Sequence, residues 1–154
     1  MPIEFSTSLD LDLLYARWYD RVDLAQFKEN FKRYLSDENY RPGRTELIDL
    51  SDLAHFDLDF RRIWGILSMV NAQLPGVKVT TRTVLIAPFD LMFGFSRMFQ
   101  SLAENAGGVK VEVYRNEEDA LTALDLPYAT IDDMLENGGF RPHTPRDASE
   151  GGAG

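Results

Sequence analysis

The stretch Thr83-Val84-Leu85-Ile86-Ala87-Pro88-Phe89-Asp90 (TVLIAPFD) decides the fold. Its four consecutive apolar residues, 84–87, do not alternate between a buried and a solvated face, so they predict a strand that is covered on both sides. Pro88 interrupts this strand, and Asp90 is placed to cap the helix that follows. A buried strand that leads directly into a helix is typical of an α/β domain.

The same alternation of strand and helix extends in both directions from this stretch. Short apolar runs between turn-forming residues predict strands, and apolar residues spaced three or four apart predict helices. The predicted strands are residues 3–6, 13–18, 46–50, 79–87 and 109–113, and the predicted helices are residues 24–36, 60–74, 91–106, 117–124 and 131–136. We therefore expect an α/β fold with a mixed five-stranded sheet and helices packed on it, in the order ββαβαβαα.

Polar side chains in front of the apolar helical patterns mark the helix starts. Asp23 followed by Gln26 has the spacing of a capping box. Asn116 and Thr130 are expected to cap the last two helices in the same way. From residue 127 onward the composition becomes polar and rich in proline and glycine. We therefore expect one domain over residues 1–126, followed over residues 127–154 by a short helix and a flexible polar tail.

Composition excludes several classes of function. The chain has 154 residues, of which 44% are hydrophobic, and this is enough for one sizeable core. It has no cysteine, which removes disulfides, thiol nucleophiles and cysteine-containing metal sites. Twenty-five acidic residues against sixteen basic ones give a net charge of -9. This charge repels a polyphosphate backbone, so we expect no nucleic acid partner.

The hydrophobic pattern predicts a cytoplasmic protein. No apolar run approaches the roughly 20 residues that a membrane-spanning helix needs, and the opening residues, MPIEFSTSLD, lack the features of a signal peptide. The negative charge also disfavours electrostatic attachment to anionic lipid. It leaves peripheral membrane contact through apolar side chains open.

Five strings of residues, together with the predicted order of elements, resemble the bacterial SpoIIAA-like proteins, relatives of the STAS anti-sigma-factor antagonists. The strings are YRPG at 40–43, IDLS at 48–51, APFD at 87–90, FGFSRMF at 93–99 and VYRNEEDA at 113–120. The resemblance covers roughly residues 5–126. None of the strings is a catalytic fingerprint, so the resemblance implies a fold rather than a mechanism.

The STAS resemblance implies a regulatory surface at the segment that follows the third predicted strand. In STAS proteins this segment carries a serine whose phosphorylation switches partner binding. By spacing, Asp59 stands here in place of that serine, so the phosphorylation switch is in doubt. Asp57 and Asp59 would be the charges that contact a partner protein. A plainer interpretation is that one of them caps the helix predicted at 60–74.

SpoIIAA-like proteins are also similar in fold to the SEC14 (CRAL-TRIO) lipid-binding domains, which implies an apolar ligand pocket. The helices predicted at 60–74 and 91–106 carry more apolar residues than one core-facing stripe needs. This surplus is compatible with core packing, with a homodimer or with a ligand cleft between the two helices. For the cleft, the expected walls are Trp64, Phe89, Phe93 and Met98, and Arg97 is the expected contact for an anionic head group.

Residues that could support catalysis are few. His55, Asp57 and Asp59 have the spacing to share one face of an extended segment, and Asp49, Asp52 and Asp90 could gather at the carboxyl ends of adjacent strands. Acidic residues are also common at helix starts for capping, so neither set predicts a metal site strongly. The chain has no nucleophile elbow and no phosphate-binding glycine loop. Ser96, inside a predicted helix, has no evident histidine partner.

The sequence therefore predicts a binding module and no enzyme, cofactor or resident metal. The main hypothesis is an apolar or amphiphilic small molecule bound between the second and third helices. The alternative is a STAS-type regulatory module that docks on a partner protein without a phosphoacceptor serine. A small hydrolase is the third hypothesis and the weakest.

Overall fold

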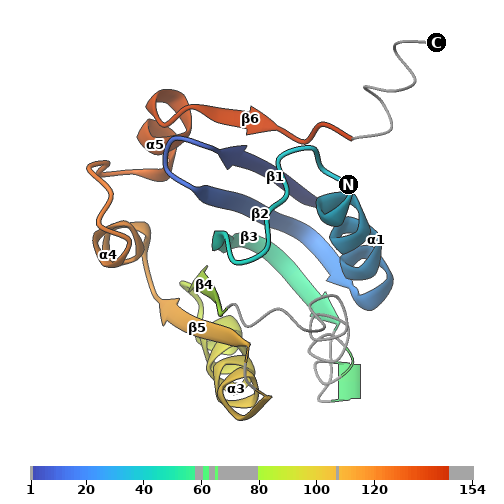
Figure 1. Cartoon of the computed structure of the whole chain (residues 1–154). Helices are drawn as coiled ribbons and strands as arrows, with labels where there is room; N and C mark the ends of the chain where they lie inside the picture. The colour runs from blue at the N-terminus through green and yellow to red at the C-terminus, as the bar shows by residue number, and fades with distance from the viewer. Residues whose placement is uncertain (1, 58–60, 63–64, 66–79, 107, 146–154) are drawn as a thin grey trace, which may run out of the picture.

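A six-stranded sheet organises the chain (Figure 1). The structure is a computed structural model, and it describes residues 2–57, 61–62, 65, 80–106 and 108–145. The strands are β1 (Ile3–Ser8), β2 (Leu13–Asp23), β3 (Thr45–Asp57), β4 (Thr81–Ile86), β5 (Val109–Tyr114) and β6 (Phe140–Pro142). The helices are α1 (Leu24–Leu35), α3 (Asp90–Ala106), α4 (Glu117–Ala123) and α5 (Ile131–Asn137). In space, the strands follow the order β5-β4-β3-β2-β1-β6.

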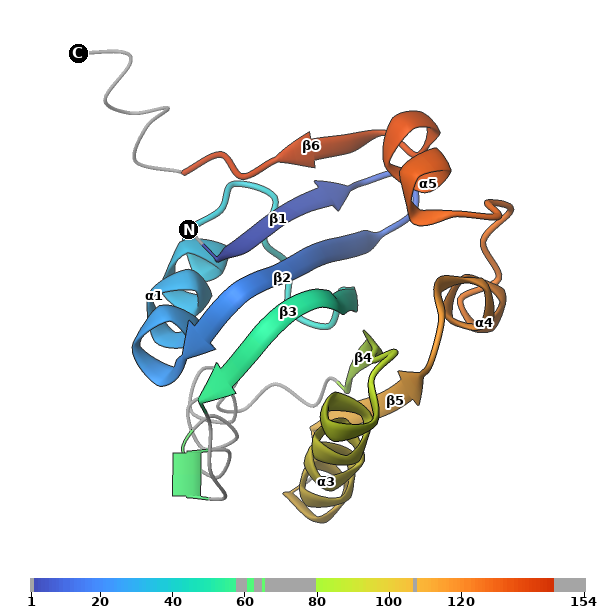
Figure 2. The same cartoon turned by 180° about the vertical axis from the view of Figure 1, so that it is seen from behind.

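The sheet is mixed. β1 and β2 form an antiparallel hairpin, and Asp12, with a φ of 52°, supplies the left-handed turn conformation before β2. From β2 onward the ladder is parallel, because β2 pairs with β3, β3 with β4, and β4 with β5. Figure 2 shows the same order from behind, with β6 and β5 at opposite edges. The carboxyl ends of the four parallel strands, β2 to β5, therefore lie at the same end of the sheet.

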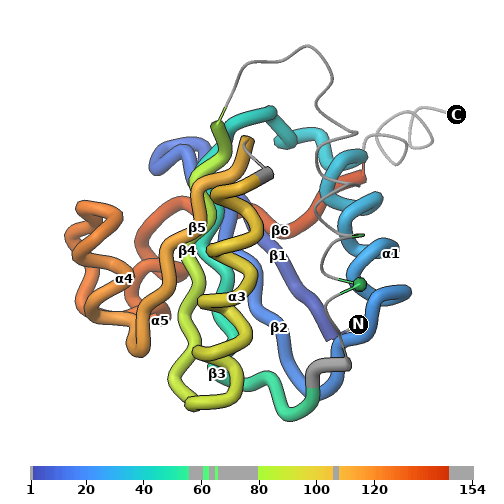
Figure 3. Tube along the Cα trace, turned by 90° about the horizontal axis from the view of Figure 1, so that it is seen from below, coloured from blue at the N-terminus to red at the C-terminus, as the bar shows by residue number. Residues whose placement is uncertain are grey.

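Helices cover both faces of this sheet (Figure 3). Alternating residues of β2 enter two different cores. On one face, α1 and α3 cover a core that contains Leu14, Ala16 and Trp18. On the other face, α4 and α5 cover a second core that contains Leu13 and Tyr15. Val84 and Ile86 of β4 belong to this second core, whereas Leu85 packs with α3 in a third cluster. The apolar run at 84–87 is therefore a strand covered on both sides, as its sequence predicts.

Three helix starts confirm the capping predictions. The Asp23 carboxylate accepts from the Gln26 amide N–H at 2.9 Å, while the Gln26 side chain accepts from the Asp23 N–H at 3.0 Å. This reciprocal pair is a complete capping box. Asn116 and Thr130 cap α4 and α5 by accepting from the N–H three residues later.

The structure corrects the predicted strands in two places. The order ββαβαβαα leaves out the strand that was predicted at 109–113, which is β5 between α3 and α4, and β6, which follows α5, was not predicted. The sheet therefore has six strands rather than five. In addition, β3 was expected over residues 46–50 but continues to Asp57. It does so because β2 also continues to Asp23 and pairs with it along this length, with register shifts near Tyr19 and Asp20. The helix expected at 60–74 lies outside the described residues, apart from isolated positions.

The flexible tail expected from residue 138 is wrong for residues 140–145. β6 pairs with β1, opposite Ser6 to Ser8, and occupies the edge of the sheet. Gly138 and Gly139 make the turn into this strand. A Cβ at Gly138 would lie 2.5 Å from the Met134 carbonyl oxygen, and Gly139 has a φ of +75°, so both positions favour glycine.

A buried carboxylate holds the segment after β6 against the end of α1. Asp37 is 1% exposed, and its Oδ2 lies 2.7 Å from His143 Nδ1 and accepts from the Thr144 N–H at 2.8 Å. Its Oδ1 accepts from the Asn39 N–H at 2.8 Å. The His143 ring also packs on Phe5, with ring centroids 4.8 Å apart. These contacts join the C-terminal strand to the main sheet.

Replacing Asp37 by alanine should destabilise the protein by about 3 kcal/mol, because the Asn39 and Thr144 amides and the His143 ring would lose their acceptor while partly buried. Urea unfolding of Asp37→Ala and of the exposed control Glu38→Ala measures the difference. Equal stabilities of the two variants would contradict the anchoring role of Asp37.

Candidate functional site

Large apolar side chains lie open to solvent where β4 passes into α3. Phe89 is 62% exposed, Leu91 is 86% exposed and Met98 is 36% exposed, and we call these three residues the α3 apolar patch. Among the described residues, the other exposed large hydrophobic side chain is Leu9, at the turn between β1 and β2. The patch therefore contains most of the exposed large apolar side chains of the described chain.

The helical periodicity of α3 explains why this patch is exposed. Phe95, Phe99, Leu102 and Ala103 face the sheet and pack with Leu85 and Val111. Leu91 and Met98, seven residues apart, lie on a different side of the helix. Gly94 lies between them on that side, and a Cβ built on it would meet nothing within 4 Å. An open strip of helix surface thus separates the two apolar side chains.

One of the predicted ligand contacts, Phe93, has other neighbours. Phe93 is half-buried, packs against the core that contains Met92, and lies under the Arg115 guanidinium, whose carbon is 3.9 Å from the ring centroid. Arg115 Nη1 also bonds to Asp90 Oδ1 at 2.6 Å. Arg97 is exposed on α3, next to Met98.

Four of the five predicted ligand residues lie in α3 or in the turn before it, namely Phe89, Phe93, Arg97 and Met98. Trp64 lies outside the described residues, and so does most of the helix that was expected to form the opposite wall. Ser96 is 2% exposed, so it is not an accessible nucleophile.

The structure describes one of the two predicted partner-binding residues, Asp57. Asp57 is the last residue of β3 and stands opposite Asp23 in the parallel ladder. It therefore ends β3, and residues 58–60, which follow it, lie outside the described residues. Asp59 lies outside the described residues. His55 is exposed in β3, opposite Arg21.

The three carboxylates that could have gathered into a metal site each have a separate polar partner. Asp49 accepts from the buried Tyr15 hydroxyl at 3.0 Å, and Asp52 pairs with Arg17 at 2.8 Å. Asp90 pairs with Arg115, as described above. Burial, and then the Asp49 carboxylate, raise the pKa of Tyr15, so its hydroxyl stays protonated. In the part of the chain that the structure describes, no three acidic or histidine side chains are grouped to hold a metal ion.

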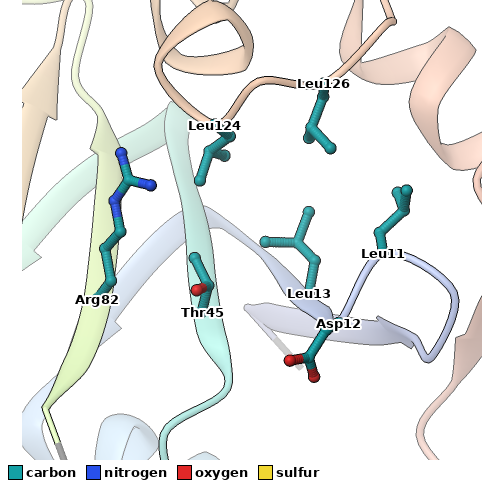
Figure 4. A pocket seen from close by; sticks show the side chains of 7 residues that line it. All are labelled: Leu11, Asp12, Leu13, Thr45, Arg82, Leu124 and Leu126. Carbon is teal, nitrogen blue, oxygen red and sulfur yellow. The ribbon is translucent and has the colours of Figure 1, made fainter.

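A small hollow lies at the amino ends of the parallel strands (Figure 4). Its volume is about 100 Å³, and its lining residues are Leu11, Asp12, Leu13, Thr45, Arg82, Leu124 and Leu126. Asp12 is ion-paired with Arg41 and Arg44, and the Arg41 hydrogen bond is the main cause that lowers the pKa of Asp12. Arg82 is ion-paired with Glu112. The hollow is too small for a lipid-like molecule, and its charged groups already have partners.

Glu46 is a titratable group that the sequence analysis did not single out. It lies on the same face of β3 as Ile48, and it accepts from the Thr83 hydroxyl at 2.8 Å. Burial raises the pKa of Glu46 to about 7, against the lowering effect of the Thr83 bond. Burial, together with this carboxylate, also raises the pKa of the nearby Tyr34. The sequence could have indicated that Glu46 is buried, because residues 46, 48 and 50 of the strand share one face, and Ile48 and Leu50 are apolar.

The parallel ladder, the opening hairpin and the two helical layers define a SpoIIAA-like α/β fold, which confirms the resemblance at the level of fold. A solved structure with this fold is an uncharacterized protein of the DUF3478 family from Shewanella loihica PV-4. It matches with a TM-score of 0.51 and 17% sequence identity, over 79% of this chain and 93% of that chain. At this identity, the likeness shows the fold alone. No protein-family model matches the sequence, and no curated protein matches it.

Glu46 should make stability depend on pH. Because its pKa is raised from 4.5 in the unfolded chain to about 7 in the folded protein, the folded state holds the proton more tightly. The free energy of unfolding should then fall by about 3 kcal/mol as pH rises from 4.5 to above 7. Glu46→Gln should remove this part of the pH dependence, whereas Glu29→Gln on the exposed side of α1 should retain it. Urea unfolding at several pH values tests this, and identical pH profiles for the wild type and Glu46→Gln would refute the role of Glu46.

Proposed function

We propose that the protein is a non-enzymatic binding module that takes up an apolar or amphiphilic small molecule against the α3 apolar patch. The observation that carries the proposal is the exposure of Phe89, Leu91 and Met98 in the first half of α3 or directly before it. Exposed apolar side chains cost free energy in water, and burying them against a ligand recovers it. Exposed apolar side chains grouped in this way commonly mark a binding site.

The charges near the patch support an amphiphilic ligand. Arg97 adjoins Met98 on α3, is exposed, and forms no ion pair with another described residue, so an anionic head group could approach it. Elsewhere the net charge of -9 repels anions at long range. The apolar surface would therefore supply most of the affinity, and Arg97 would orient the head group. None of the described helices is long and apolar enough to cross a membrane.

The direct test is native mass spectrometry of protein that is purified gently and without detergent. A retained mass in the range of a lipid or an apolar metabolite would support the proposal and identify the class of ligand. A protein that carries no such mass, and that also fails to bind the apolar fluorophore 1-anilinonaphthalene-8-sulfonate, would overturn it.

Leu91→Ser should weaken binding of this fluorophore several-fold, because it removes the most exposed side chain of the patch. The fold should be unaffected, since exposed substitutions usually change stability by no more than about 0.5 kcal/mol. Leu9→Ser is the matched control, because Leu9 is an exposed leucine at a distant turn. Fluorescence titration measures both affinities, and equal losses in the two variants would count against the patch as the site.

Arg97→Gln should separate the charged part of the interaction from the apolar part. Binding of the sulfonated fluorophore should weaken by up to about fivefold, which is the range of an exposed ion pair. Binding of the uncharged dye Nile red should not change, because the apolar surface remains. If the two dyes lost affinity equally, Arg97 would contribute packing rather than recognition of an anion.

Docking of a partner protein through Asp57 and Asp59 is the alternative proposal. Its support is the resemblance to STAS regulators and the position of Asp57 at the end of β3. The double variant Asp57→Asn with Asp59→Asn removes both charges and keeps the side-chain volume. A partner that co-purifies with the wild type but not with this variant would favour the regulatory function.

A further inference from the structure

The sequence contains a single asparagine that is followed by glycine, Asn137. In an Asn-Gly pair, the backbone nitrogen of glycine can lose its proton to a base and attack the amide carbon of the asparagine side chain, because glycine has no Cβ to hinder the approach. Ammonia leaves and a succinimide ring forms. Water then opens the ring at either carbonyl group and gives aspartate or isoaspartate. Asn137 is exposed at the end of α5, so water and base reach it.

The backbone at the end of α5 opposes this attack. The Gly138 N–H donates to the Met134 carbonyl at 2.7 Å, so the attacking nitrogen holds its proton in the folded state. Asn137 is the last residue of α5, and a helical residue has a ψ of about −42°. The ring closes only after ψ rotates away from this value and brings the nitrogen to the amide carbon. Ring closure therefore requires the last turn of α5 to open.

The side chain of Asn137 is restrained as well. Its Nδ2 donates to Asp133 Oδ1 at 2.6 Å and lies 3.3 Å from the Asp133 carbonyl oxygen, one turn back along the helix. These bonds direct the amide toward the preceding turn of α5. The Asp133 carboxylate can be removed without loss of the helix cap, because its bond to Thr130 is made by its backbone N–H.

Gly138 is also the first residue of the segment that covers β1 at the edge of the sheet, and we call residues 138–145 the C-terminal strap. The Gly138 carbonyl accepts from the buried Ser8 hydroxyl at 2.6 Å. A Cβ at Gly138 would lie 3.0 Å from two neighbouring side chains, so the backbone is closely packed there. After β6, the Thr144 N–H donates to the Asp37 carboxylate at 2.8 Å.

Deamidation would give the strap a backbone that no longer fits. Isoaspartate continues the chain through its side-chain carbon, which adds one methylene group between residues 137 and 138. Either product also adds a negative charge beside Asp133 at the C-terminal end of a helix, where the helix dipole opposes it. Gly138 has no room to absorb the extra length, so the Ser8 bond and the register of β6 on β1 would be lost.

We propose that Asn137–Gly138 is a deamidation site that the Asp133 and Met134 contacts hold closed, and that its conversion to isoaspartate makes release of the C-terminal strap irreversible. Water is the co-reactant and ammonia is the leaving group. Local opening of α5 exposes the site, so the rate of deamidation follows how often this part of the fold opens. β6 and β5 lie at opposite edges of the sheet, so the site is separate from the α3 apolar patch and does not depend on a ligand there.

Peptide mass spectrometry of the full chain, incubated at mildly alkaline pH in buffer and in concentrated urea, tests the closed site. In urea, Asn137 should convert before the other asparagines, and in buffer it should convert at least about tenfold more slowly. Asp133→Ala should raise the rate in buffer several-fold. Asp132→Ala, an exposed change of the same charge in the same helix, should not. Equal rates in buffer and in urea, or in the two variants, would overturn the proposal.

Hydrogen exchange of the separated isoaspartate form tests the release of the strap. The Thr144 N–H, bonded to Asp37, and the Glu38 N–H, bonded to the Thr144 carbonyl at 3.0 Å, should lose protection. The Gln26 N–H in the capping box of α1 is the internal control and should keep its protection. Unchanged protection at Thr144 and Glu38 would contradict the proposal, and so would an equal loss at Gln26, because the damage would then extend beyond the strap.

Discussion

A parallel ladder without a solvated face is the constraint on which the rest of this structure depends. β4 lies between β3 and β5, and its side chains enter a separate core on each face of the sheet. Parallel strands cannot be joined by tight turns, so the chain must cross over between them, and the crossing helices become the two covering layers. The hairpin of β1 and β2 and the short β6 extend this sheet on its antiparallel side.

The proposed ligand surface follows from the way α3 covers the ladder. A helix that packs on two strands needs only one apolar stripe, and Phe95, Phe99 and Ala103 supply it. The remaining sides of α3 are available for other contacts. One of these sides carries Leu91 and Met98, which suit an apolar ligand. A single helix therefore serves the core and also offers an exposed apolar surface.

Much of the fold could be predicted from local patterns, and the misses share a physical cause. The caps at Asp23, Asn116 and Thr130 were predictable because they involve groups only three residues apart. The second half of β3 was missed because its polar residues do not resemble a strand. They are held in one by the backbone of β2, a partner that is distant in sequence. β6 was missed for the same reason, because three residues form a strand only against β1 and with His143 bonded to Asp37.

The same distinction between local patterns and distant contacts applies to the candidate site. The sequence by itself determined the fold class, the helix starts and the apolar richness of α3, because these depend on periodicity and on contacts between near neighbours. Only the tertiary structure decided which apolar residues stay exposed, that Ser96 is buried, that Asp49, Asp52 and Asp90 each have a separate partner, and that Glu46 lies in a desolvated position. Exposure, pairing and desolvation are properties of the neighbours that the fold brings together, and a residue's own sequence context does not contain those neighbours.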